Sequence, residues 1–343
     1  MSILDKILGK DTNYQPKALS DADSQMRKVL EKLQELGIEP IETLSPEEAR
    51  AQPTPADAVK AILRDRKMDP DADLGVETED VMWDGPGGSQ PARVYRPKGA
   101  DSTKPVVVYF HGGGWVIADI DVYDSSPRGI CRFADCVVIS FEYRRAPEHK
   151  FPAAHQDAYA AYTWAIANAS RFGGDPENIA LVGESAGGNL ACATAIAARD
   201  TGLQAPKHMV LVYPVADNDL NSESYQEWAD AKPLNKPMMQ WFVGHVFEDE
   251  SQTSDPRVKL VSADLSNLPS ATIIRAEIDP LRTDGEKLAQ ALRDAGVEVR
   301  DHTFNGSTHE FFGMALVVPD AAAAQTFATH ELKRAFGTAV LPI

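Results

Sequence analysis

The chain has 343 residues, is 43% hydrophobic and carries a formal net charge of −17, with 51 Asp and Glu against 34 Lys and Arg. A chain of this length and composition can bury a full-sized core, and its excess of negative charge disfavours nucleic acid as a partner. No run of about 18 uncharged apolar residues occurs, which argues against a membrane-spanning helix.

The N-terminal segment, up to about residue 54, has a helical pattern at "DADSQMRKVLEKLQELG" (21–37). Its first residues mix charges among apolar side chains and lack the long apolar run and small-residue cleavage site of a signal peptide. Three cysteines, Cys131, Cys136 and Cys192, lack the Cys-x-x-Cys spacing of a zinc site or a redox pair. We therefore expect a cytoplasmic protein with reduced thiols and no bound metal.

An antiparallel hairpin is expected after this segment. The runs "GVETEDVMW" (75–83) and "ARVYRP" (92–97) alternate apolar with polar residues and flank the turn signal "DGPGG". Such alternation is typical of strands with one face buried and one face in water. The pair therefore indicates a hairpin at the edge of a sheet.

Six further runs rich in β-branched residues alternate with helical patterns along the rest of the chain. The runs are 106–110, 136–143, 179–184, 208–215, 271–278 and 297–304, and the helical patterns lie near 125–134, 154–168, 186–200, 284–295 and 320–335. Near-continuous apolar strands between helices are typical of parallel strands covered on both faces. We predict an α/β fold with a mostly parallel, eight-stranded sheet flanked by helices.

Residues 216–266 interrupt this alternation. An insertion of such length in an α/β sheet is usually a functional lid or cap, because a structureless loop so long is rare. It contains Met238, Met239, Trp241 and Phe242 at helical spacing. These side chains either pack the insertion onto the core or line an apolar substrate pocket.

The segment "IALVGESAGGNLA" runs from a predicted strand through Gly183-Glu184-Ser185-Ala186-Gly187 into a predicted helix. This is the strand–turn–helix context that the G-x-S-x-G nucleophile motif requires, with small residues beside a serine held in a strained turn. A serine that merely caps the helix is the alternative. We predict that Ser185 is a nucleophile.

A nucleophilic serine needs a base and a carboxylate that orients the base, in the chain order Ser, acid, His. Asp279 directly follows the strand 271–278, and His309 lies in the loop "NGSTHEFFG" after the last strand. Glu277, within the strand, and Asp284, at the expected helix start, are the alternative acids. We predict Asp279 as the acid and His309 as the base.

Three glycines, Gly112 to Gly114, follow the strand "VVVYF". A dinucleotide fingerprint starting there would need Gly or Ala where Ile117 stands, and the Gly-Lys-Ser/Thr of a P-loop is absent. Backbone that approaches a ligand closely is the better explanation. In an acyl-transfer site the N–H groups of Gly113, Gly114 and Ala186 would form an oxyanion hole, with Trp115 as a pocket wall.

Five motifs together carry a family resemblance: "HGGGWV" (111–116), "YRRAPEHKFPAA" (143–154), "GESAGGNLA" (183–191), "DPLRTDG" (279–285) and "HEFFGM" (309–314). In their order and content the chain resembles the bacterial hormone-sensitive-lipase-like esterases (family IV) of the α/β-hydrolase fold. Two positions depart from the pattern: Glu184 stands where many relatives have Asp, and Glu310 where many have Gly.

The resemblance implies a catalytic triad of Ser185, Asp279 and His309 that works without cofactor or metal. It also implies a helical cap, formed by 1–54 and 216–266, on a catalytic domain of 55–215 and 267–343, and a homodimer. The expected function is hydrolysis of a small-molecule ester with a short to medium acyl chain. The alternatives are a non-catalytic small-molecule receptor on the same fold, or an amidase or peptidase with the same triad.

Overall fold

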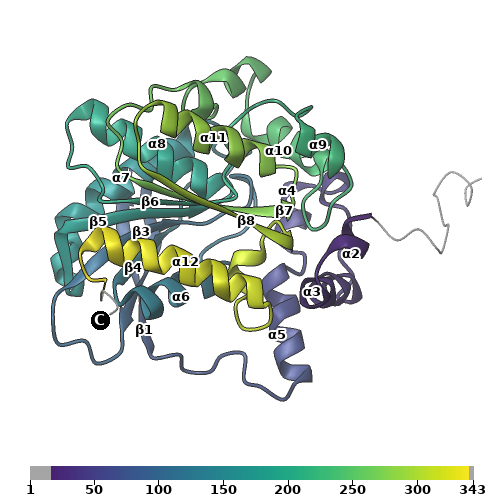
Figure 1. The fold of residues 1–343 in the computed structure, drawn as a ribbon, viewed down its shortest axis with the longest axis horizontal. Coiled ribbons are helices and arrows are strands. Elements are labelled where there is room, and N and C mark those ends of the chain that lie inside the picture. The colour runs from purple at the N-terminus through teal and green to yellow at the C-terminus, as the bar shows by residue number, and fades with distance from the viewer. Residues whose placement is uncertain (1–16, 340–343) are drawn as a thin grey trace, which may run out of the picture.

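The computed structural model describes residues 17–339, in which one eight-stranded sheet has the order β1-β2-β4-β3-β5-β6-β7-β8 (Figure 1). The pairs β1–β2 and β2–β4 are antiparallel, and the other neighbouring strands are parallel. The predicted edge hairpin and mostly parallel sheet are confirmed. The strands are β1 (Val76–Gly85), β2 (Gly88–Pro97), β3 (Lys104–Phe110), β4 (Val137–Phe141), β5 (Gly174–Glu184), β6 (Met209–Val212), β7 (Ala271–Ile278) and β8 (Val299–Thr308).

Helices cover both faces of the sheet (Figure 1). One face carries α6 (Ser125–Ala134) and α12 (Pro319–Phe336), and the other carries α7 (Ala153–Asn168), α8 (Ala186–Thr201) and α11 (Arg282–Asp294). Successive side chains of a strand point to opposite faces, so a central strand must be apolar throughout. In β3, Val106 and Val108 belong to the core under α7 and α8, whereas Val107 belongs to the core under α6 and α12.

The N-terminal helices are α2 (Lys17–Asp21), α3 (Ser24–Glu35), α4 (Pro46–Arg50) and α5 (Pro55–Asp65). The predicted domain boundary at residue 54 falls on Thr54, which caps α5: its Oγ accepts the Asp57 N–H at 3.3 Å, and the Asp57 carboxylate accepts the Thr54 N–H at 2.8 Å. Because α5 packs against α3, the helical N-terminal segment continues to Asp65. Residues 1–16 and 340–343 of the predicted domains lie outside the described residues.

The insertion between β6 and β7 contains α9 (Glu223–Glu227), α10 (Lys236–Val246) and two short 3₁₀ turns, η3 (Glu250–Ser254) and η4 (Leu260–Ser262). Helix α10 packs against η1 (Ile41–Thr43) of the N-terminal segment. Two segments far apart in the sequence are therefore side by side at one end of the sheet.

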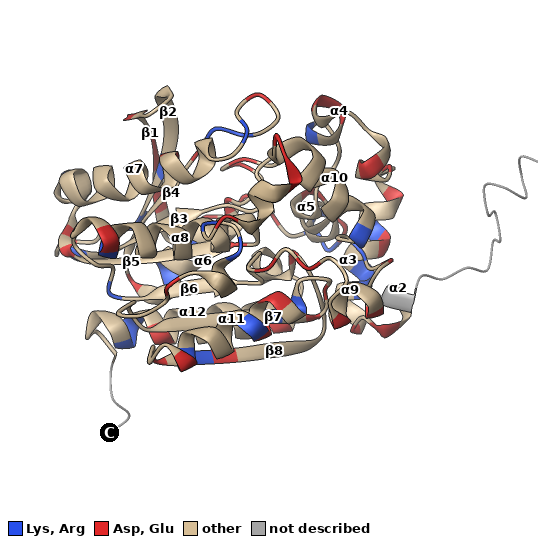
Figure 2. Ribbon diagram, turned by 90° about the horizontal axis from the view of Figure 1, so that it is seen from above, with Lys and Arg blue, Asp and Glu red and all other residues tan. Residues whose placement is uncertain are grey.

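Charged residues are spread over many elements of the fold. Figure 2 shows Asp and Glu in red on helices and loops throughout the described chain, with Lys and Arg in blue among them. The three cysteines are buried and unpaired. Within residues 17–339, no helix combines the length and hydrophobicity that crossing a membrane requires.

Candidate active site

Ser185 lies in a sharp turn between β5 and α8, with φ 57° and ψ −118°. This conformation is unfavourable for a residue with a Cβ and persists only where the surroundings enforce it. A Cβ on Gly183 would overlap the Gly187 carbonyl, and a Cβ on Gly187 would overlap the carbonyls of Phe110 and His111. The small residues of the motif are therefore required by the space between β5, α8 and the end of β3.

Loops after β7 and β8 bring an acid and a base to this turn. His309 Nε2 lies 3.0 Å from Ser185 Oγ, and His309 Nδ1 lies 2.7 Å from Asp279 Oδ2. The other Asp279 oxygen accepts the Leu281 N–H at 2.8 Å. All three side chains are buried, with Asp279 fully so. The arrangement can pass a proton from the serine hydroxyl to the imidazole while the carboxylate fixes the ring.

The alternative acids make other contacts. Glu277 accepts the Gly306 N–H at 2.7 Å. Asp284 is the third residue of α11 and accepts the N–H groups of Ala216 and Asp217 at 3.0 and 2.9 Å, so it tethers the chain after β6 and does not cap its own helix. Burial raises the pKa of Asp284 to about 7. No hydrogen bond or ion pair joins either side chain to His309 within the described residues.

The surroundings of His309 favour its protonated form. Burial by itself lowers the pKa of the imidazole, but the charge of Asp279 and its hydrogen bond outweigh burial, with smaller contributions from Glu310 and Glu184. The pKa of His309 is therefore raised above its usual value of 6.5. A base of this kind holds a proton firmly once it has taken one from a nucleophile.

The glycine loop after β3 has the backbone freedom that the sequence indicated. Gly113 and Gly114 have φ of 96° and 59°, in the left-handed region that favours glycine. Gly112 has no such φ, but a Cβ there would overlap the Tyr123 hydroxyl. Within the described chain, the N–H groups of Gly113 and Gly114 have no hydrogen-bond acceptor. Neither has that of Ala186, the first residue of α8, where helical N–H groups lack an intrahelical acceptor.

A cavity of about 320 Å³ opens over the serine. Its lining contains Ser185, His309 and the two glycines of the loop, and it draws further residues from the N-terminal segment and from the 216–266 insertion. A mostly apolar pocket of this size with a few polar groups is typical of a small-molecule site. No group of His, Cys, Asp and Glu in residues 17–339 is arranged to hold a metal ion.

The family model for the alpha/beta hydrolase fold matches residues 107–313, a range that holds the serine, the acid and the base. The chain belongs to the alpha/beta hydrolase family. Carboxylesterase NlhH of Mycobacterium tuberculosis is 39% identical over 291 residues, which cover 82% of this chain and 91% of NlhH. An ethyl acetate hydrolase of Pseudomonas putida is 32% identical over 302 residues, covering 86% of this chain and 92% of that protein.

Solved structures agree with this assignment. A Pyrobaculum calidifontis esterase has a TM-score of 0.80 at 34% identity, with 91% of this chain and 98% of that chain covered. The predicted resemblance to hormone-sensitive-lipase-like esterases and the predicted α/β-hydrolase fold are confirmed.

The side chains predicted for the pocket of this α/β-hydrolase separate into two groups. Trp115, Met238, Met239 and Phe242 line the catalytic cavity. Trp241 is not part of the lining; its ring packs against Phe242 and His245, and its Nε1 donates to the Leu44 carbonyl at 3.0 Å. The prediction for Trp241 is therefore corrected, because helical spacing does not reveal that this face of α10 meets the N-terminal segment.

Arg50, at the end of α4, is a supporting residue that was not among the residues predicted for the site. Its guanidinium donates to the carbonyls of Val116 and Ala146 at 2.8 and 2.7 Å and pairs with Glu148 at 2.7 Å. It thereby joins the glycine loop to the "YRRAPE" segment. Arg145 also donates to this loop, at the Ala118 carbonyl. In one sequence, nothing distinguishes an arginine at the end of a short helix from a solvated charge.

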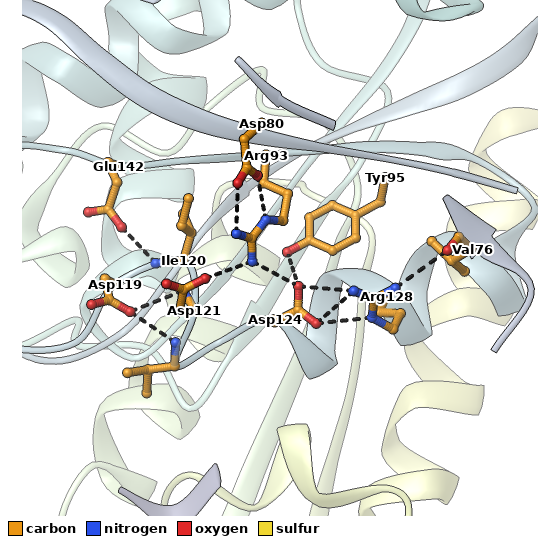
Figure 3. Close-up of polar contacts among 11 residues, drawn as sticks. Val76, Asp80, Arg93, Tyr95, Asp119, Ile120, Asp121, Asp124, Arg128 and Glu142 are labelled. Carbon is orange, nitrogen blue, oxygen red and sulfur yellow. Dashed lines mark hydrogen bonds and ion pairs between the residues drawn. The ribbon is translucent and has the colours of Figure 1, made fainter. Parts of the chain in front are cut away.

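A polar cluster fixes the continuation of the glycine loop into α6, as Figure 3 shows. Arg93 of β2 lies between Asp80 of β1 and the carboxylates of Asp121 and Asp124, with shortest distances of 2.6, 2.8 and 3.2 Å. The Ile120 N–H donates to Glu142 at 2.6 Å. The segment that carries Tyr123 into the cavity wall is therefore attached to Arg93 of β2 and to Glu142, the residue after β4.

Two glutamates flank the triad. Glu184 precedes the serine, accepts from the hydroxyls of Tyr109 and Tyr213, and has a pKa that burial raises to about 7. Glu310 follows the histidine, accepts from the Tyr123 hydroxyl at 2.5 Å, and has a pKa that burial raises although the charge of His309 opposes the shift. Glu310 has φ 70°, where glycine would cost nothing and another residue costs roughly 1 kcal/mol.

Proposed function

We propose that this protein is a serine carboxylesterase that hydrolyses small esters with short to medium acyl chains. The observation that carries the proposal is the continuous hydrogen-bonded chain from Asp279 through His309 to Ser185 at the base of an apolar cavity. The names of its relatives, a carboxylesterase and an ethyl acetate hydrolase, support the same class of reaction. Hydrolysis of a chain-length series of p-nitrophenyl esters by the wild type and Ser185→Ala tests the reaction and the pocket together.

In the proposed mechanism His309 Nε2 takes the proton of Ser185 as Oγ attacks the ester carbonyl carbon. The carbonyl oxygen becomes an oxyanion, for which the free N–H groups of Gly113, Gly114 and Ala186 form the proposed hole. The intermediate expels the alcohol, which leaves with the proton from His309. Water then attacks the acyl-enzyme in the same way and releases the acid.

We propose that the N-terminal segment and the 216–266 insertion together form a cap over this site. Both segments contribute residues to the cavity lining, for example Pro40 and Met239, and they contact each other through α10 and η1. The cap then limits the length of the acyl or alcohol group that fits. A homodimer and a cytoplasmic location stay predictions.

The first prediction from this mechanism concerns pH. His309 must be neutral to accept the serine proton, and its pKa is raised above 6.5. Activity is therefore lost as pH falls through this raised value, and the acid limb of kcat/KM should have its midpoint above pH 6.5. A kcat/KM profile for p-nitrophenyl butyrate between pH 5 and 9 measures it. A midpoint at or below 6.5 would contradict the environment described for His309.

The second prediction concerns pocket size. The Phe242 ring lies so close to Gly114 that a Cβ on this glycine would overlap it. Phe242→Ala should enlarge the cavity beside the reacting carbonyl and raise kcat/KM for the octanoate relative to the butyrate ester about tenfold. Trp241→Phe is the control, because Trp241 lies outside the lining. A larger shift in the control than in Phe242→Ala would show that the pocket lies elsewhere.

Assays also separate the remaining alternatives. A non-catalytic receptor would turn over none of these esters. An amidase or peptidase would hydrolyse an anilide at least as fast as the matched ester. The hydrogen bond between His309 and Ser185 supports an enzyme, because a receptor has no need of a base on the serine.

A further inference from the structure

A second, smaller cavity lies beside the catalytic one. Its volume is about 30 Å³, and the polar side chains in its lining are Tyr123, Ser125, Ser126, Glu184 and Glu310. A cavity of roughly 10–15 Å³ with two to four polar partners is enough to hold a water molecule. The small cavity therefore has both the room and the chemistry for water.

Glu310 and Tyr123 separate the two cavities. They line both, together with Pro55 and Val122, which have no polar side-chain atoms. The Tyr123 hydroxyl holds Oε1 of Glu310, and no hydrogen bond to Oε2 is made within the described chain. Glu310 thus has one oxygen fixed and one available to a ligand at the boundary between the cavities.

A buried hydroxyl also lines the small cavity. Ser126 is fully buried, and hydrogen bonding by its side chain lowers the pKa of Glu184, against the rise that burial causes. Buried polar groups in proteins are normally paired, with water where no protein group is available. A water in the small cavity can donate a hydrogen bond to the free oxygen of Glu310.

We propose that the small cavity is a water site and that Glu310 is a positioning residue for the water that hydrolyses the acyl-enzyme. The inference rests on the proposed function. In this step the water oxygen bonds to the acyl carbon and one water proton moves to His309 Nε2. The bond to Ser185 Oγ then breaks, the proton returns to Oγ, and the acid leaves with the second water proton. Glu310 Oε2 accepts a hydrogen bond from that second proton and so orients the water.

The backbone places Glu310 correctly for this role. It lines the catalytic cavity together with Ser185 and His309, so a water bound to its free oxygen can lie in the cavity that holds the base. Its left-handed φ would suit glycine better, which means that the side chain is present in spite of the backbone. The Arg93 cluster holds the segment of Tyr123, and through Tyr123 it fixes the orientation of the carboxyl.

Competition between water and methanol tests the proposal. Methanol has a single O–H proton, which goes to His309, so it has no second O–H group that could donate a hydrogen bond to Glu310. Glu310→Gln should therefore slow hydrolysis of the butyryl-enzyme more than its methanolysis. With p-nitrophenyl butyrate in aqueous methanol, we expect the ratio of methyl butyrate to butyric acid to rise about tenfold, the effect of losing one hydrogen bond to a charged group. Acylation should slow less than hydrolysis, because the charge of Glu310 favours the His309 imidazolium in both steps but holds the water in only one of them.

Gly313→Ala is an independent variant that leaves Glu310 in place. Gly313 lines the small cavity but not the catalytic cavity, and its φ is not left-handed. A Cβ on it would lie 2.9 Å from Ser125 Oγ and 3.3 Å from Ser126 Oγ. The added methyl group takes space from the water and should raise the product ratio in the same direction. Glu331→Gln removes a buried carboxyl on α12 that lines neither cavity, and should leave the ratio unchanged.

The outcomes are distinguishable. An unchanged ratio in Glu310→Gln would overturn the proposal, as would equal slowing of acylation and deacylation. Should Glu310→Gln fail to fold, the ratio in Gly313→Ala decides in the same way. Absence of a butyryl group on Ser185 of the wild type, read by mass spectrometry after rapid quenching, would instead overturn the proposed function.

Discussion

Replacing Ser185 by alanine is expected to lower kcat/KM for p-nitrophenyl butyrate by at least about 10³-fold. The variant removes the Oγ that accepts the acyl group and leaves a methyl group in its place. What activity remains would come from the cavity and the N–H groups, which bind the ester without forming a covalent intermediate. A stopped assay at high enzyme concentration, with mass spectrometry for the acyl-enzyme, measures both effects.

The fold of this variant should persist, since Ser185 contributes its strained backbone and not its hydroxyl to packing. Ser222→Ala is a matched control: Ser222 is also a buried serine, but it lies in the insertion and outside the cavity lining. It should retain wild-type turnover. Retained turnover in Ser185→Ala, with a native circular dichroism spectrum, would remove Ser185 as the nucleophile.

The elements predicted from the sequence depend on local periodicity. Strand β3 is recognisable because residues 106–110 are apolar on both faces, which follows from helices above and below the sheet. The G-x-S-x-G turn is recognisable because a Cβ on Gly183 or Gly187 would overlap backbone carbonyl groups, so that only small residues are compatible with the turn. In both cases the requirement acts on consecutive residues and is visible in one sequence.

The supporting contacts could not be predicted because they join residues that are distant in the sequence. Arg50 reaches the "YRRAPE" segment at Glu148, and Tyr123 reaches Glu310. Each of these side chains by itself is compatible with a solvated surface position or an ordinary core position. Trp241 shows the same limit on one helix: spacing identifies an apolar face, but only the packed structure reveals whether that face meets the cavity or the N-terminal segment.

The hydrogen bonds around the site explain why Glu184 can be buried and Glu310 half-buried. Tyr109 and Tyr213 donate hydrogen bonds to Glu184, and Tyr123 donates one to Glu310. These bonds offset the hydration that the carboxylates lose in the protein. Burial nevertheless raises both pKa values. The negative charge that remains lies next to His309, where it favours the imidazolium that forms during each step of the reaction.

Asp279→Asn is expected to lower kcat for p-nitrophenyl butyrate by about 10⁴-fold, as the equivalent change does in the protease triad. Asp279 Oδ2 lies 2.7 Å from His309 Nδ1, which fixes the tautomer that leaves Nε2 free for the serine proton. An amide can hold the wrong tautomer and carries no charge to stabilise the imidazolium. Wild type, Asp279→Asn, Glu277→Gln and Asp284→Asn are compared in one kcat series.

The pH profile gives a second, independent readout for Asp279→Asn. Since the Asp279 carboxylate raises the pKa of His309, its loss should move the acid limb of the residual activity to lower pH. Glu277→Gln and Asp284→Asn should stay within about tenfold of wild type and keep the wild-type limb, because their carboxylates bind backbone N–H groups away from His309. Wild-type turnover in Asp279→Asn, with loss of turnover in Glu277→Gln or Asp284→Asn, would assign the acid to Glu277 or Asp284 instead. The imidazole of His309 would then have to take a different orientation from the one in which it bonds Asp279 and Ser185.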